Sequence, residues 1–96
     1  MNGDRKVAYT DAGEVDETLR ATLVDVLGLD RDQVARFTEA TPLLGALPEF
    51  DSMAVAGLLT ELEERLGILI EDHEVDAEML ETYGELLTFA RAKALR

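Results

Sequence analysis

A serine hydroxyl at the start of a predicted helix is the group in this chain best placed to do chemistry. Pro48 disfavours helix in the residues before it, so the next helix is expected to begin at Asp51 or Ser52, with one of them as N-cap. Ser52 should then lie at the surface, at the positive end of the helix dipole. A phosphate esterified to its oxygen would be stabilised by the dipole and by free N–H groups of the first turn.

The rest of the chain offers Ser52 no catalytic apparatus. Serine is a weak nucleophile without an adjacent base. The only histidine is His73, and the G-x-S-x-G turn of serine hydrolases is missing. We therefore expect no enzyme, but a serine that accepts a group in a reaction catalysed by another protein. The competing interpretation is an ordinary N-cap serine, and the two interpretations are compatible.

The residues after Ser52 repeat with the period of one helical face. The apolar positions are Met53, Val55, Ala56, Leu58, Leu59, Leu62 and Leu66. This spacing predicts an amphipathic helix from Ser52 to about Leu66, ended by Gly67. Such a helix positions the serine because its apolar face must be buried against other elements.

Three further segments predict an all-α fold, a four-helix bundle with a long first loop and a short third helix. Besides the helix at Ser52, helices are expected over residues 11–27, 72–80 and 82–96. Capping-box pairs mark two of the starts, Asp11 with Glu14 and Thr82 with Glu85. Residues 1–10 are predicted to be a flexible tail, and residues 11–96 a single domain.

The connection over residues 29–50 is too long to be structureless in a small domain. A short turn of helix is expected over residues 30–37. Apolar side chains should pin the loop to the core, namely Val34, Phe37, Leu43, Leu44 and Leu47. The loop is expected to hold Ser52 in the open.

The formal net charge of -12 on 96 residues excludes several classes of partner. Nucleic acids and anionic membrane surfaces should repel the chain, whereas a basic protein surface should attract it. No apolar run is long enough to span a membrane, and the polar N-terminus is unlike a secretory signal. The absence of cysteine excludes disulfides and thiolate zinc sites. A monomeric, cytoplasmic protein is expected.

Four short motifs together resemble the carrier-protein family, whose members include acyl, peptidyl and D-alanyl carriers. These motifs are Asp51-Ser52-Met53, Leu58, Leu62-Glu63-Glu64 and Leu66-Gly67-Ile68. The resemblance covers residues 15–96 and implies a bundle of acyl-carrier type. It also implies that a phosphopantetheinyl transferase attaches 4′-phosphopantetheine from coenzyme A to Ser52, and that Asp51 helps the transferase and its metal to recognise this serine.

The resemblance further implies that the arm holds acyl groups as thioesters and delivers them to acyl ligases, synthases or acyltransferases. Residues 41–53 are similar to stand-alone carriers of bacterial exosortase and exopolysaccharide gene clusters, which suggests a specialised exopolysaccharide or secondary pathway. Two alternatives stay open, a peptidyl or aminoacyl carrier and an unmodified helical interaction module.

The resemblance also implies a docking surface for basic partner enzymes around the helix after Ser52. Its expected residues are Glu49, Met53, Ala54, Glu61, Glu63 and Glu64. The competing interpretation is a solvated polar face. Fatty-acid carriers often have acids or longer side chains where this chain has Ala54, Gly57 and Thr60. A dedicated partner with a more apolar contact is therefore expected.

Two other residue patterns are candidate ligand-binding sites. Acids alternate from Asp72 to Glu78, but the central glycine of a calcium loop is missing, so no metal site is expected and His73 should be a surface residue. A second hypothesis is an acyl slot lined by Leu58, Leu59, Leu62, Ile70 and Leu86 and opened by Ala56 and Gly57. A filled core is the favoured interpretation of these side chains.

Overall fold

The computed structural model describes residues 12–95, and these residues form helices and connecting loops. The elements are α1 (Ala12–Leu27), α2 (Arg31–Ala35), α3 (Ser52–Leu66), the 3₁₀ turns η2 (Asp72–Glu74) and η3 (Glu78–Leu80), and α4 (Tyr83–Ala94). Within this range the only β-type pairing is an isolated bridge between Pro42 and Thr82. The prediction of an all-α fold is confirmed. No helix in the described range is both long and apolar enough to cross a lipid bilayer.

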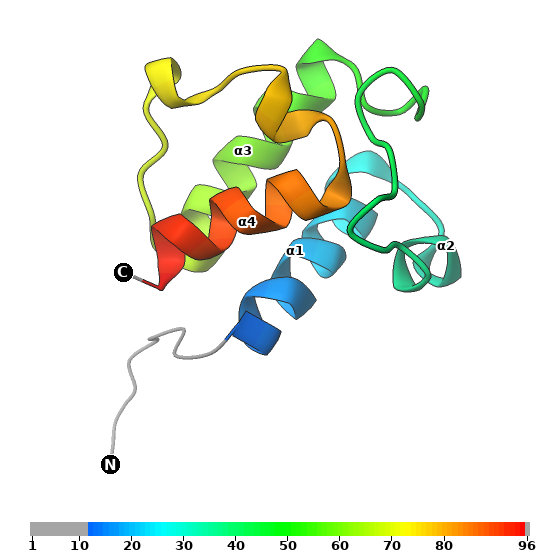
Figure 1. The fold of residues 1–96 in the computed structure, drawn as a ribbon, viewed down its shortest axis with the longest axis horizontal. Helices are drawn as coiled ribbons and strands as arrows, with labels where there is room; N and C mark the ends of the chain where they lie inside the picture. Colours follow the sequence, from blue (N-terminus) through cyan, green and yellow to red (C-terminus); the bar gives the residue numbers. More distant parts are fainter. Residues whose placement is uncertain (1–11, 96) are drawn as a thin grey trace.

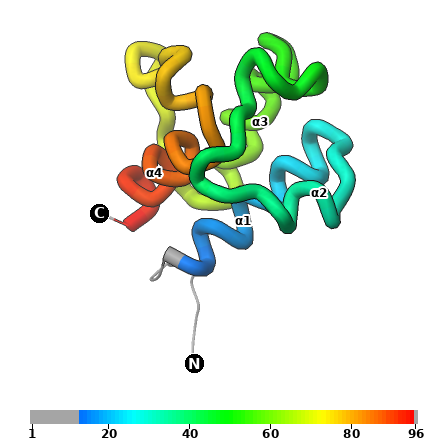
Figure 2. The backbone as a smooth tube through the Cα atoms, turned by 45° about the vertical axis from the view of Figure 1, so that its right-hand side comes forward, coloured from blue at the N-terminus to red at the C-terminus, as the bar shows by residue number. Residues whose placement is uncertain are grey.

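The core lies between α1, α3 and α4, the three long helices (Figures 1 and 2). Each helix buries apolar side chains spaced three or four residues apart, as an amphipathic helix must. The most deeply buried include Val15, Leu19 and Leu23 of α1, Leu58 and Leu62 of α3, and Tyr83 and Leu86 of α4. Burying one such leucine contributes about 1.5–3 kcal/mol. The bundle therefore gives α3 a fixed position, and with it the residue at its start.

The predicted ends of α1 and α3 and the predicted start of α4 agree with the structure. Gly28 and Gly67, at the ends of α1 and α3, have φ angles of 71° and 65°, the left-handed conformation that glycine adopts without strain. Thr82 caps α4 by accepting a hydrogen bond from the backbone N–H of Glu85. The predicted start at Asp11 and the predicted tail over residues 1–10 lie outside the described residues.

The long first loop contains the expected short helix, α2, and then leads to the start of α3 (Figure 2). Val34, Phe37 and Leu43 are buried as predicted, and Leu47 is half-buried. The prediction for Leu44 was wrong, because its side chain is 39% exposed. Its backbone N–H donates to the carbonyl oxygen of Leu80, so this stretch is tied to the bundle by main-chain hydrogen bonds and Leu44 itself can face solvent.

The predicted short third helix consists of two separate 3₁₀ turns, η2 and η3. Met79 and Leu80 of η3 are buried, as expected, and Val75 is partly buried. The turn η2 buries none of its residues, because it contains only polar side chains. A helix in a protein gains most of its stability by burying an apolar face. With no such face before Val75, the segment forms one capped turn and then becomes extended.

Candidate functional site

Ser52 is the first residue of α3, and its side chain is exposed. Asp51, not Ser52, is the N-cap: its backbone is extended, and its Oδ1 accepts a hydrogen bond of 2.8 Å from the N–H of Ala54. The first turn of α3 contains no acidic residue. The Ser52 hydroxyl therefore stands at the positive end of a 15-residue helix without serving as its cap.

Phe50 helps to fix this serine, although sequence reasoning did not single it out. Phe50 is 3% exposed and Val55 is 9% exposed, and both belong to the same apolar core. They stand immediately before the N-cap and four residues after it, the spacing of a hydrophobic staple. This pairing was a signal available in the sequence. It fixes the angle at which the loop enters α3, and so the direction in which Ser52 projects.

The six predicted docking residues differ in how freely a partner could reach them. Glu49 and Glu64 are exposed, and Met53 is 86% exposed, whereas Ala54 is half-buried. Glu61 forms an ion pair of 2.9 Å with Arg65. Glu63 accepts a 2.8 Å hydrogen bond from the N–H of Ile70. Glu61 and Glu63 thus each have an intramolecular contact, while Met53, Glu49 and Glu64 project outward.

Arg65 explains why Glu61 is held against the bundle. Its guanidinium also contacts Asp25 of α1 at 2.8 Å, so it joins α1 to α3. The hydrogen bond to Asp25, followed in importance by the hydrogen bond to Glu61, raises the pKa of Arg65 above its ordinary value. The carboxylate of Glu61 therefore has less freedom to pair with a partner than that of Glu64.

An exposed stripe runs along α3 from the end at which Ser52 lies. It consists of Met53, Gly57, Thr60 and Glu64, all exposed and spaced by three or four residues. Such spacing places them on one face of the helix. One carboxylate occurs on the stripe, at the end far from Ser52. Near the serine, the stripe offers a methionine and a bare glycine backbone, as the sequence predicted for a weakly acidic first turn.

A cavity of about 490 Å³ opens beside Ser52, between α3 and the segment that leads to η2. Its walls are Ser52, Val55, Ala56, Leu59, Thr60 and Glu63 of α3, with Ile70, Asp72 and Val75 from the opposite side. Figure 1 shows that segment returning along the bundle from the end of α3.

Of the residues considered for an acyl slot, some line this cavity and others do not. Leu59, Ile70 and Ala56 line the cavity beside Ser52. Leu58, Leu62 and Leu86 are 0–1% exposed and fill the core instead. Gly57 is exposed and does not line the cavity; a Cβ built on it would lie 3.6 Å from a side-chain carbon of Val26 in α1. The helical period explains the division, because Leu58 and Leu59 project about 100° apart around α3.

Two polar contacts fix the far wall of this cavity. The first is the hydrogen bond from Ile70 to Glu63, and the second is an ion pair of 2.9 Å between Lys93 of α4 and Glu74 of η2. A hydrogen bond from the N–H of Glu71, together with Lys93, lowers the pKa of Glu74 below its ordinary value. Glu74 therefore stays ionised and keeps η2 attached to α4.

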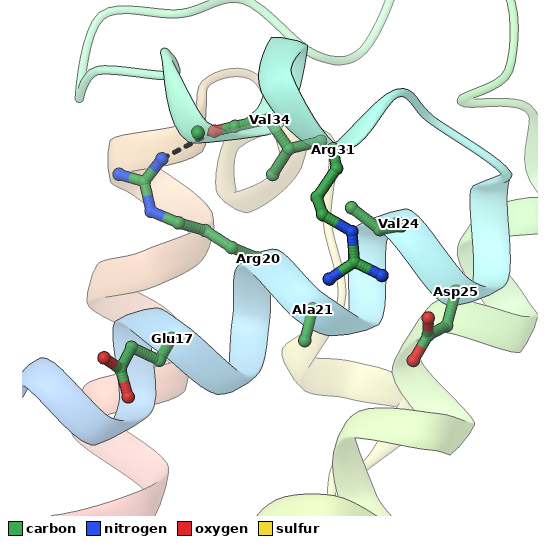
Figure 3. Close-up of a pocket in the computed structure, with 8 residues that line it drawn as sticks. Glu17, Arg20, Ala21, Val24, Asp25, Arg31 and Val34 are labelled. Carbon is green, nitrogen blue, oxygen red and sulfur yellow. Dashed lines mark hydrogen bonds between the residues drawn. The ribbon is translucent and has the colours of Figure 1, made fainter.

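Other polar groups do not assemble into a site. Within residues 12–95, no three histidine or carboxylate side chains converge to hold a metal ion. His73 is exposed. A second cavity, of about 390 Å³, lies between α1 and α2, where Arg20 donates a 2.6 Å hydrogen bond to the carbonyl oxygen of Val34 (Figure 3). It contains none of the predicted site residues.

The fold has a counterpart among solved structures. It superposes on the solution NMR structure of a holo acyl carrier protein from Nitrosomonas europaea with a TM-score of 0.72. The two chains are 39% identical, and the match covers 80% of this chain and 92% of the other. No protein-family model matches the sequence.

Proposed function

Because this chain belongs to the acyl carrier protein family, we propose that it carries 4′-phosphopantetheine on Ser52 and transports acyl groups on that arm. The members of this family are carriers and not catalysts. The observation that best supports the proposal is the exposed Ser52 hydroxyl at the start of α3. This hydroxyl does not cap the helix, because Asp51 does. The bound arm would supply a thiol that holds an acyl group as a thioester.

The residues around Ser52 suit a phosphodiester. The N-terminus of α3 favours an anion, and the first turn adds no carboxylate that would repel one. Asp51 uses Oδ1 for the cap, which leaves Oδ2 for recognition by a phosphopantetheinyl transferase and its metal. The transferase would supply the base that the chain lacks, and coenzyme A the arm.

We further propose that partner enzymes dock on the exposed stripe of α3 and on Glu49. These partners would be acyl ligases, synthases or acyltransferases with a basic rim, which the net charge of -12 attracts. Met53 would enter an apolar depression of the partner. Ala54, Glu61 and Glu63 would contribute less, because Ala54 is half-buried and the two glutamates have intramolecular contacts.

The weakly acidic start of α3 favours a dedicated pathway, of the exopolysaccharide or secondary type, over general fatty-acid synthesis. The cavity beside Ser52 would shield the acyl group between partners, since its walls include Val55, Leu59 and Ile70. Tethering raises the concentration of the acyl group at each docked active site. We also propose that the protein is a monomer and acts in the cytoplasm, where coenzyme A is available.

Intact-mass spectrometry tests the attachment site. The chain is incubated with coenzyme A, magnesium and a transferase of broad specificity. A single adduct of phosphopantetheine mass is expected, and it should be lost in Ser52→Ala, which removes the only serine of the sequence. Thr88→Ala removes an exposed hydroxyl from α4 and should still accept the arm.

The same experiment distinguishes the alternatives. Ser52→Ala should melt like the parent, because Asp51 still caps α3, so loss of the adduct would not reflect unfolding. No adduct with several transferases would instead favour an unmodified interaction module. Loading with amino acids in place of acyl groups, assayed with adenylating ligases, would point to an aminoacyl or peptidyl carrier.

A further inference from the structure

Met53 is an unusually accessible thioether next to the proposed attachment site. It follows Ser52 in the chain and is 86% exposed. The other methionine within the described residues, Met79, is 7% exposed and belongs to the core. Thioether sulfur is oxidised at a rate that depends on its exposure. The two side chains therefore differ in their accessibility to a small oxidant, although both are in the same small fold.

We propose that Met53 is a site of reversible oxidation by peroxides, and that its sulfoxide weakens docking at Ser52; this rests on the proposed function. The sulfur donates an electron pair to one oxygen of the peroxide, a sulfur–oxygen bond forms, and the O–O bond breaks. With hydrogen peroxide, water is released, so the sulfur loses two electrons and the peroxide gains them. Two thiols can reverse the step, giving the thioether, a disulfide and water.

The position of Met53 gives this oxidation a consequence for binding. The first turn of α3 has no acidic side chain, and the nearest residues along the exposed stripe are a glycine and a threonine. The thioether is thus the largest apolar group that the stripe offers near Ser52. A sulfoxide is polar and loses its hydrogen bonds to water when a partner covers it. This loss reduces the affinity if the partner offers no hydrogen-bond donor in place of the water.

The fold should tolerate the oxidation. Met53 is not part of the apolar core, which contains Val55 and Leu58 on the opposite side of α3. A sulfoxide at Met53 remains in water while the protein is free, so the melting temperature should not change. Oxidation of Met79, in contrast, would place a polar oxygen in the core and destabilise the protein. Oxidation at Met53 should therefore slow loading without lowering the melting temperature.

The test exposes the unmodified chain to increasing hydrogen peroxide, locates the added oxygen by peptide mapping, and then measures the initial rate of transferase loading. Met53 is expected to oxidise at least about tenfold faster than Met79, in keeping with its exposure. Loading of the oxidised protein should slow at least about fivefold, as for truncation of an apolar contact in an interface. Treatment with a methionine sulfoxide reductase and a dithiol should restore the rate.

Three variants make the result specific. In Met53→Leu, the ratio of loading rates with and without peroxide should be one, whatever the basal rate. Met53→Gln, which resembles the sulfoxide in length and polarity, should load slowly without peroxide. Met79→Leu should keep the sensitivity of the parent, because it leaves Met53 in place.

Other outcomes would overturn the proposal. Equal oxidation of Met53 and Met79 would contradict the selectivity, and an oxidised chain that loads at the original rate would contradict the docking role. If the untreated chain never accepts the arm, the proposed function fails as a whole. Unchanged loading after selective oxidation would leave that function intact and remove only this inference.

Discussion

Replacing Asp51 should separate the stability of α3 from its recognition by the transferase. In the structure, Oδ1 of Asp51 accepts the N–H of Ala54 at 2.8 Å. Asp51→Ala removes this acceptor, and losing an N-cap costs about 1 kcal/mol. For a domain of this size, that loss lowers the melting temperature by about 4–8 °C. Asp51→Asn keeps an acceptor of the same length, so it should lose only a few tenths of a kcal/mol from the weaker charge–dipole interaction.

The assay measures melting by circular dichroism and loading by intact mass on the same preparations. Asp51→Ala should lose stability and load slowly. Asp51→Asn should melt close to the parent and still load slowly, because it removes the carboxylate that we propose the transferase recognises. Thr82→Ala is the matched control: it removes the cap of α4, a hydrogen bond of 3.1 Å to the N–H of Glu85. It should lose a similar stability and load at the normal rate.

Three results would refute this reasoning at different points. An unchanged melting temperature in Asp51→Ala would mean that Asp51 does not cap α3, and Ser52 would then be the candidate cap. Normal loading of Asp51→Asn would mean that the transferase does not use the carboxylate. Slow loading of Thr82→Ala would show that stability alone governs the assay, and no recognition role could be drawn from Asp51.

The other predictions concern the scaffold. Gly84→Ala should cost about 1–3 kcal/mol in urea unfolding, because a Cβ there would lie 2.7 Å from the carbonyl oxygen of Glu39; Gly57→Ala, whose Cβ would meet its nearest neighbour at 3.6 Å, should cost nothing. Glu74→Gln should be less stable than the parent at neutral pH. The difference should shrink as the pH falls below about 4.5, the ordinary glutamate value, and through the lowered pKa of Glu74. Magnesium chloride should raise the melting temperature by screening the net charge of -12, and an equal osmolality of sucrose serves as the control.

The long helices were predictable because each has one strong local signal. Val15, Leu19 and Leu23 repeat at the helical period, and all three are fully buried. Gly67 ends α3 in the left-handed conformation that its residue type favours. The exposure of Ser52 was predicted from its place at the N-terminus of that helix, and the side chain is exposed in the structure.

The contacts made between segments were not predictable in this way. Leu44 resembles Leu43 as a loop residue, yet Leu43 is fully buried and Leu44 is 39% exposed. The difference depends on main-chain hydrogen bonds to Leu80 and Glu81, which are far away in the sequence. The choice between Asp51 and Ser52 as N-cap is similar: both residue types cap helices well, and backbone geometry decides between them.

The region that sequence reasoning described least well is also the wall of the cavity beside Ser52. The segment from Ile70 to Val75 has no helical apolar face, so periodicity could not predict its structure. For the same reason η2 is attached to the bundle by polar contacts, the Lys93–Glu74 ion pair above all, and not by buried side chains. Charged contacts near the surface stabilise less than a buried leucine does. A group attached to Ser52, as we propose, would therefore meet α3 on one side and, on the other, a part of the cavity wall that polar contacts attach to the fold.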